Sequence, residues 1–320
     1  MAKAKKPKAI KLKRPENPQD VRQFWRGTAQ LIGAILFVGV CALGFRTMKH
    51  WVEHRLAFPA APPKVVLLNR PVWMSDTLAE RIAAAARPAV PHSALDHQLL
   101  VNSVEMLRTN PWIAKVNEVR RVYGQAPGDT IEIDCDYRAP IALVRWVDAK
   151  TKHEAYWFVD AQGVKLPEEF AAADLPRLIF GQNGRVNLRI VEGVQCPPPV
   201  HPGQRWTGDD LYAGLELVRA LYGLPYTEEI QRVDVSNFQG RIDPREAQLV
   251  LVTNKNTEIR WGHPLHSTNF EVSDATKLNY LQKVRAQYGR VDGNWPWLDI
   301  RFDKITHPAQ LPADAHADTR

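Results

Sequence analysis

Hydrophobic residues follow three patterns along the chain. Residues 31–45 form an unbroken apolar run, and residues 64–140 hold one strand pattern, two amphipathic helix patterns and two more strand patterns. Beyond residue 140, most segments alternate apolar and polar positions, as strands with one buried face do. The chain is therefore predicted to be an α+β protein. It has one apolar N-terminal helix, a β-α-α-β-β unit and a mostly antiparallel β-domain with two helices.

Capping and turn signals delimit the elements of the β-α-α-β-β unit. Thr77 and Glu80 have the spacing of a capping box at the first helix, and Ser93 and Asp96 precede the second. In the β-domain, two helices are predicted, at Thr207–Tyr222 and Ser273–Tyr288, and either Ser273 or Asp274 can cap the second. Strands are predicted at 64–74, 114–123, 130–137, 141–148, 154–163, 175–181, 230–238 and 247–262.

The closing stretch, "WPWLDIRFDKI" at residues 295–305, has the period of a half-buried strand. One predicted face holds the apolar residues Pro296, Leu298, Ile300 and Phe302. The other holds Trp297, Asp299, Arg301 and Asp303. A last strand often lies at a sheet edge, where free N–H and C=O groups can pair with another chain.

The positive charge of the chain is concentrated at its N-terminus. Residues 1–26 carry nine Lys or Arg against Glu16 and Asp20, which gives +7, the net charge of the whole chain. The remaining 294 residues balance 33 basic and 33 acidic groups. A basic tail can bind nucleic acid, but the segment that follows gives a better explanation.

That segment is predicted to cross a membrane. Residues 28–45 carry no charge, and extension to 27–47 gives 21 residues between Trp25 and Trp51, which suit the two membrane interfaces. The preceding cations then place the N-terminus in the cytoplasm. A cleaved signal peptide, a lipoprotein signal at Cys41 and a buried core helix are the competing interpretations. We expect an uncleaved anchor, with most of the protein outside the cytoplasm.

The three cysteines do not form a disulfide framework. Cys41 lies in the apolar segment, Cys135 is expected to be a buried thiol, and Cys196 begins a Pro-rich loop. A Cys135–Cys196 disulfide is a minor alternative in an oxidising compartment.

Catalytic motifs are absent from the sequence. There is no G-x-S-x-G, H-E-x-x-H, P-loop or G-x-G-x-x-G pattern. His263 and His266 are close in sequence, but they lack the further ligands that a metal site requires, so a polar turn is expected. We expect no catalytic residue, no metal, no cofactor and no small-molecule substrate.

Together, these features resemble the FtsQ/DivIB family of bacterial cell-division proteins. The stretches that carry the resemblance are "NPWIAKVNEVRRVY" (110–123), "YRAPIALVRW" (137–146), "YWFVDAQGVKLP" (156–167), "LPRLIFG" (175–181) and "WLDIRFDKI" (297–305). The resemblance covers about residues 22–305 and implies six segments. These are a basic cytoplasmic tail (1–27), a transmembrane helix (28–47), a juxtamembrane linker (48–63), a POTRA domain (64–140), a β-domain (141–307) and a flexible C-terminal tail (308–320).

The resemblance implies a non-enzymatic scaffold in the inner membrane at the division septum. Such a scaffold binds FtsB/FtsL-like bitopic coiled-coil proteins at its last strand and other division proteins through its POTRA domain, and so helps to control septal peptidoglycan synthesis. The implied partner-binding residues are Trp297, Leu298, Asp299, Ile300, Arg301 and Phe302. A membrane-tethered POTRA protein of secretion or envelope biogenesis is the main alternative, and an anchored cell-wall enzyme is a weaker one.

Overall fold

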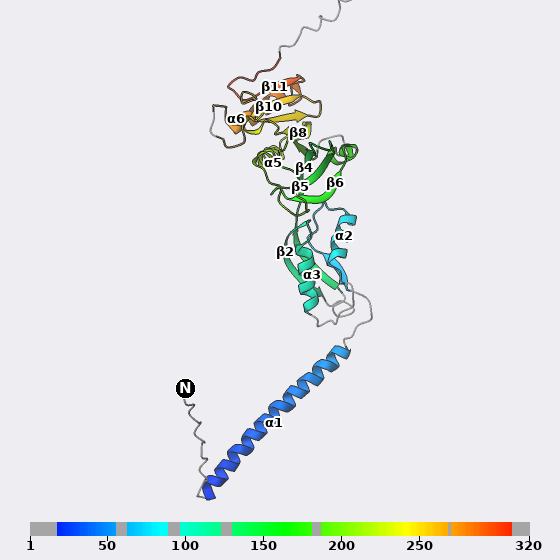
Figure 1. Ribbon diagram of the computed structural model, residues 1–320, viewed down its shortest axis with the longest axis vertical. Helices are drawn as coiled ribbons and strands as arrows, with labels where there is room; N and C mark the ends of the chain where they lie inside the picture. The colour runs from blue at the N-terminus through cyan, green and yellow to red at the C-terminus, as the bar shows by residue number, and fades with distance from the viewer. Residues whose placement is uncertain are drawn as a thin grey trace, which may run out of the picture.

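The computed structural model describes residues 18–55, 63–88, 97–122, 130–180, 187–267 and 270–308. Helix α1 is followed by a small three-stranded sheet with two helices and then by a larger eight-stranded sheet (Figure 1). This order confirms the predicted α+β class. The predicted cap at Ser93 and Asp96 and nearly all of the predicted C-terminal tail lie outside the described residues.

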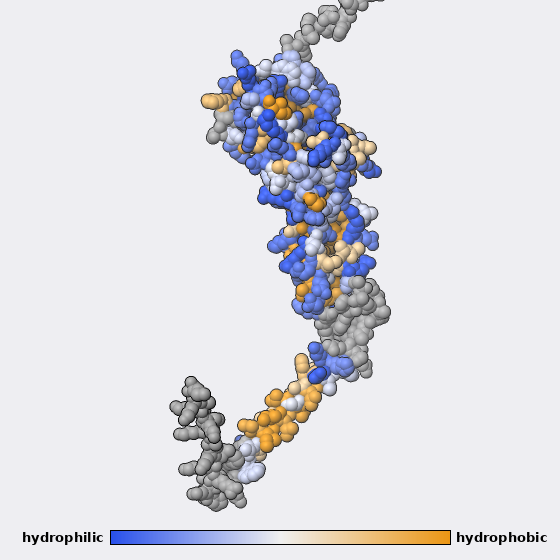
Figure 2. Space-filling model, viewed as in Figure 1, coloured by the Kyte–Doolittle hydropathy of each residue, from blue (hydrophilic) through white to orange (hydrophobic). Residues whose placement is uncertain are grey.

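Helix α1 spans Pro18–Arg55 and holds one stretch, Thr28–Val52, that is long and apolar enough to cross a membrane. Apolar side chains cover most of this stretch (Figure 2), and none of its most hydrophobic window is buried in the protein. Trp25 precedes this stretch by three residues and Trp51 lies at its C-terminal end, and both side chains are exposed. Helix α1 continues to Arg55, through the first eight residues of the predicted juxtamembrane linker (48–63), which contain neither Gly nor Pro.

The small unit has the predicted β-α-α-β-β order. Its sheet order is β1-β3-β2, with β1 parallel and β2 antiparallel to β3. Both helices pack their apolar residues onto the sheet, where they meet buried Ile131, Ile133 and Trp112. Ser75, not Thr77, caps the first helix by accepting a hydrogen bond from the Leu78 N–H at 3.2 Å. The elements are β1 (Lys64–Leu67), α2 (Asp76–Ala86), α3 (Gln98–Arg108), β2 (Ile113–Val122) and β3 (Thr130–Tyr137).

The large sheet has the order β11-β10-β9-β8-β7-β4-β5-β6. Four of its neighbouring pairs are antiparallel, but β4–β7, β7–β8 and β10–β11 are parallel. The mostly antiparallel domain of the prediction is therefore a mixed sheet. Its strands are β4 (Pro140–Val147), β5 (Glu154–Asp160), β6 (Lys165–Phe170), β7 (Arg189–Glu192), β8 (Ile230–Asp234), β9 (Leu249–Thr253), β10 (Glu258–Gly262) and β11 (Trp297–Asp299).

Helices cover both faces of this sheet. The two predicted helices, α5 (Asp209–Leu221) and α6 (Asp274–Tyr288), contribute Leu215 and Leu281 to the main core, and Ser273 caps α6 as predicted. On the other face, the short helix α4 (Leu175–Ile179) packs against the sheet, so the strand predicted at 175–181 is wrong. Single 3₁₀ turns lie at Ala172–Asp174, Thr227–Glu229 and Phe238–Gly240.

Candidate interaction site at the edge strand β11

Strand β11 is an edge strand, as predicted, but it is much shorter than residues 295–305. It pairs in parallel with β10, and Leu298 lies beside Ile259. Residues 301–304 then bend away from the strand direction. The chain returns so that Thr306 forms an antiparallel bridge with Asp299. A strand that turns back so soon presents only a short edge.

The side chains of this stretch follow the predicted alternation as far as Ile300. Leu298 and Ile300 are fully buried in the main core. Trp297 is half-buried, and its ring lies 5.1 Å from the Arg260 guanidinium. Phe302, predicted to face the core, is 52% exposed. The prediction is wrong there because the period of two applies only while the backbone stays extended.

Asp299 and Arg301 form an ion pair within the domain. The guanidinium donates from Nη2 to Asp299 Oδ2 at 2.7 Å and from Nε to both carboxylate oxygens at 3.1 Å. Its Nη1 donates to the Arg245 carbonyl at 3.1 Å. These side chains are only 11% and 10% exposed, and the hydrogen bonds to Asp299 raise the pKa of Arg301. Arg301 is therefore engaged inside the molecule and gives a partner little free charge to contact.

The outer side of β11 is largely occupied by the chain itself. The Asp299 N–H donates to the Thr306 carbonyl at 2.8 Å, and the Thr306 N–H donates back at 3.0 Å. The Val272 N–H donates to the Arg301 carbonyl at 2.9 Å. Continued in this register, the antiparallel pairing would place Pro308 opposite Trp297, and proline has no N–H to donate.

Trp297 therefore has outward N–H and C=O groups, with no partner among the described residues. We call residues 304–308 the terminal strap. The backbone of the terminal strap closes the edge at Asp299 through two hydrogen bonds. The stacking of His307 on Trp295, at a ring distance of 3.8 Å, also holds it. The open part of the edge is one residue long.

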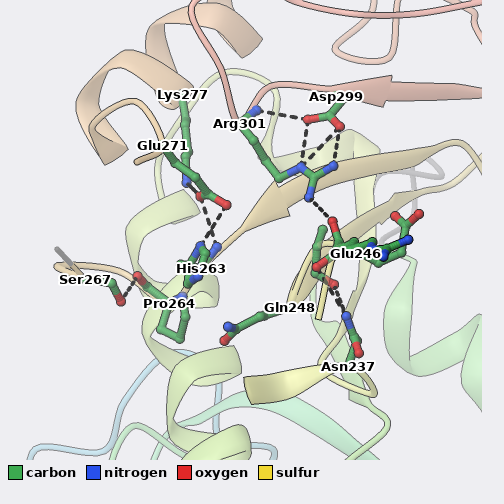
Figure 3. Close-up of polar contacts among 12 residues, drawn as sticks. Asn237, Glu246, Gln248, His263, Pro264, Ser267, Glu271, Lys277, Asp299 and Arg301 are labelled. Carbon is green, nitrogen blue, oxygen red and sulfur yellow. Dashed lines mark hydrogen bonds and ion pairs between the residues drawn. The ribbon is translucent and has the colours of Figure 1, made fainter. Parts of the chain in front are cut away.

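A second polar cluster holds the loop whose Val272 N–H donates to the Arg301 carbonyl. The buried carboxylate of Glu271 accepts a hydrogen bond from Lys277 Nζ at 2.6 Å and lies 2.8 Å from His263 Nδ1 (Figure 3). The Glu271 and Lys277 side chains are 6% and 2% exposed. Lys277 also lies 5.1 Å from the Trp261 ring. The cluster connects β10 to α6 across the loop and thereby fixes the Val272 N–H against β11.

Acid is expected to weaken this cluster. Burial disfavours the Glu271 carboxylate, but hydrogen bonds from Lys277 and His263 outweigh it and lower its pKa below the ordinary value of 4.5. A lowered carboxyl pKa stabilises the fold fully above about pH 5, and this contribution is lost as the pH falls through the folded-state value. The free energy of unfolding of wild type should therefore exceed that of Glu271→Gln at pH 7. The difference should shrink as the pH falls to 3; a constant difference would contradict this role.

His266 and the three cysteines are the other residues that the sequence raises as candidates for metal binding or disulfide formation. His266 donates its backbone N–H to Asp274, and in the part of the chain that the structure describes no group of three potential metal ligands is found. Cys41, Cys135 and Cys196 are all free thiols, so the alternative disulfide is not formed. Burial is the main cause that raises the pKa of Cys135 to about 11, which makes it a poor nucleophile.

Sequence reasoning missed the terminal strap and the Glu271 cluster. Asp299 and Thr306 are bridged although seven residues apart, and no local pattern marks that bridge. Glu271 precedes the predicted cap Ser273, and its burial depends on the position of α6. Pro308 is the sequence feature that could have indicated a limited edge, because a proline beside an edge strand often ends pairing.

No family model matches the chain, and a search of curated proteins finds no match.

Proposed function

We propose that this protein is a non-enzymatic, single-pass scaffold of the bacterial division machinery, of the FtsQ/DivIB type. In this proposal α1 anchors it in the inner membrane, with the N-terminus in the cytoplasm and the bulk outside, at the septum. The small unit is a POTRA domain that docks other division proteins. The observation that carries the proposal is the edge strand β11, whose outer side is closed by a strap with only two backbone hydrogen bonds.

The site favours binding by strand exchange. A strand from an FtsB/FtsL-like partner would pair with Trp297 and Asp299 and replace the terminal strap, which is β-augmentation. Two net hydrogen bonds are worth about 1–3 kcal/mol, so displacing the backbone of the strap costs little beside the bonds a longer strand makes. Leu298 and Ile300 would stay in the core as supports, and Phe302 would offer an exposed aromatic contact.

Membrane anchoring is supported by the single apolar stretch Thr28–Val52 and the cation-rich segment before it. The β-α-α-β-β order of the small unit supports the POTRA assignment. No cofactor or substrate is part of the proposal.

Depletion of the protein in its host should block septation and produce filaments with evenly spaced nucleoids. Microscopy of a conditional strain measures this, with the same strain carrying the gene on a plasmid as the control. Normal division with a defect in outer-membrane assembly would instead support the alternative of a tethered POTRA protein in secretion or envelope biogenesis.

A further inference from the structure

A cavity of about 810 Å³ lies where the small unit meets the large sheet. The small unit contributes Trp73, Leu78 and Trp112 to its wall, and the large sheet and its helices contribute Ile141, Phe158 and Leu178. The rings of Trp73 and Trp112 lie 6.0 Å apart. This volume falls within the usual range of binding pockets, about 300–1,000 Å³.

The two units hold the cavity between them. Arg81 of α2 donates to Glu168 of β6 at 2.7 Å across the junction. Leu166, also from β6, is fully buried in the core of the small unit. The cavity therefore has walls fixed by contacts on both sides and is largely formed before anything binds.

The charged residues that line the cavity are mainly positive. Four arginines line it, from α2, α4, β7 and α5, and among the described lining residues Glu168 is the single acid. Arg177 is highly exposed and lies 3.7 Å from an exposed Asp174. Arg219 is exposed, and its side chain makes no hydrogen bond or ion pair with residues the structure describes. An apolar hollow surrounded by arginines is complementary to an anion that also carries apolar groups.

We propose that this cavity is a second docking site, which binds an acidic segment of a partner protein. The segment would insert one or two large apolar side chains between Trp73, Trp112 and Leu178. It would place carboxylates on Arg177 and Arg219. A peptide fits better than a single lipid headgroup because the arginines come from separate elements, and a peptide spaces several carboxylates along its length. This site does not depend on the edge strand or on the division function.

The test is selection from a random 12-residue phage-displayed peptide library on the full chain in phosphatidylcholine nanodiscs. The enriched peptides are then synthesised with a fluorophore, and their Kd is measured by anisotropy. We expect them to carry at least two acidic residues and a large apolar one. Arg177→Glu with Arg219→Glu should weaken binding at least about tenfold, because each substitution replaces an attraction to a peptide carboxylate by a repulsion.

Arg108→Glu is the matched control, because Arg108 is an exposed helix arginine that does not line the cavity; it should change Kd less than about twofold. A photo-crosslinker at the cavity residue Tyr222 should label with the peptide, whereas one at exposed Val200 should not. The proposal is overturned if no peptide is enriched, or if binding survives the double charge reversal. Displacement of the peptides by phosphatidylglycerol vesicles from wild type alone would assign the cavity to anionic lipid and would also overturn it.

Discussion

Replacing Asp299 with alanine will lower the free energy of unfolding by about 3–5 kcal/mol. The substitution leaves the Arg301 guanidinium, only 11% exposed, without its carboxylate. It also removes an anion that lies 4.0 Å from Arg260. Urea unfolding of the full chain, followed by tryptophan fluorescence, measures the loss.

Two variants separate the buried charge from a general effect of substitution. Asp303→Ala, at an exposed position four residues on, should change the free energy by less than about 0.5 kcal/mol. Asp299→Ala combined with Arg301→Met should recover most of the loss, because removing both charges leaves neither buried alone. If the double variant is no more stable than Asp299→Ala, the ion pair does not explain the effect.

Replacing Phe302 with aspartate will weaken capture of the proposed FtsB/FtsL-like partner at least about tenfold, or about 1.4 kcal/mol. Phe302 is 52% exposed and lies outside the main core, and its ring is 5.2 Å from the Arg301 guanidinium, which keeps its bonds to Asp299 in the variant. The affinity for the partner is measured by pull-down with the full chain held in nanodiscs. The unfolding free energy should stay within about 0.5 kcal/mol of wild type.

Thr306→Pro should raise the affinity for the partner, whereas Phe302→Asp lowers it. It removes the N–H that Thr306 donates to Asp299, so the partner displaces a weaker strap and affinity should rise by about 2–10-fold. Thr306→Ala keeps that N–H and should leave affinity unchanged. Loss of capture in Thr306→Pro would mean that the strap is part of the binding surface.

Substitutions at Ile300 or Arg301 would not test partner binding at the edge of β11 by itself. Arg301→Glu would place a second carboxylate beside Asp299 in a nearly buried site, and Ile300→Pro would remove an N–H that donates to the Arg260 carbonyl. Both would destabilise the sheet itself. Phe302 and Thr306 separate binding from stability more cleanly.

Local signals in the sequence predicted most elements of the fold. The order of the small unit, helices α5 and α6 and the cap at Ser273 all depend on spacings within a few residues. The segment at 175–181 was misassigned because five apolar residues in seven suit either a strand or a short buried helix. The tertiary packing of Ile179 decides between them.

Long-range contacts could not be predicted in this way. Arg138 and Asp160 form a nearly buried ion pair at 2.6 Å, yet they are 22 residues apart in the sequence. The same is true of the cavity between the units, whose walls come from residues 73–222. The sequence shows which apolar and basic residues the chain contains, but only the packing of the two units brings those residues together around one cavity.

The most direct test of the central claim is site-specific photo-crosslinking in living cells. A photoreactive residue at Phe302 should yield one main adduct with a single-span coiled-coil division protein, identified by mass spectrometry. The control is the same residue at Val200, which is exposed beside the opposite sheet edge, where Lys165 bonds the Pro199 carbonyl. No adduct from position 302, or the same adduct from both positions, would contradict partner binding at β11.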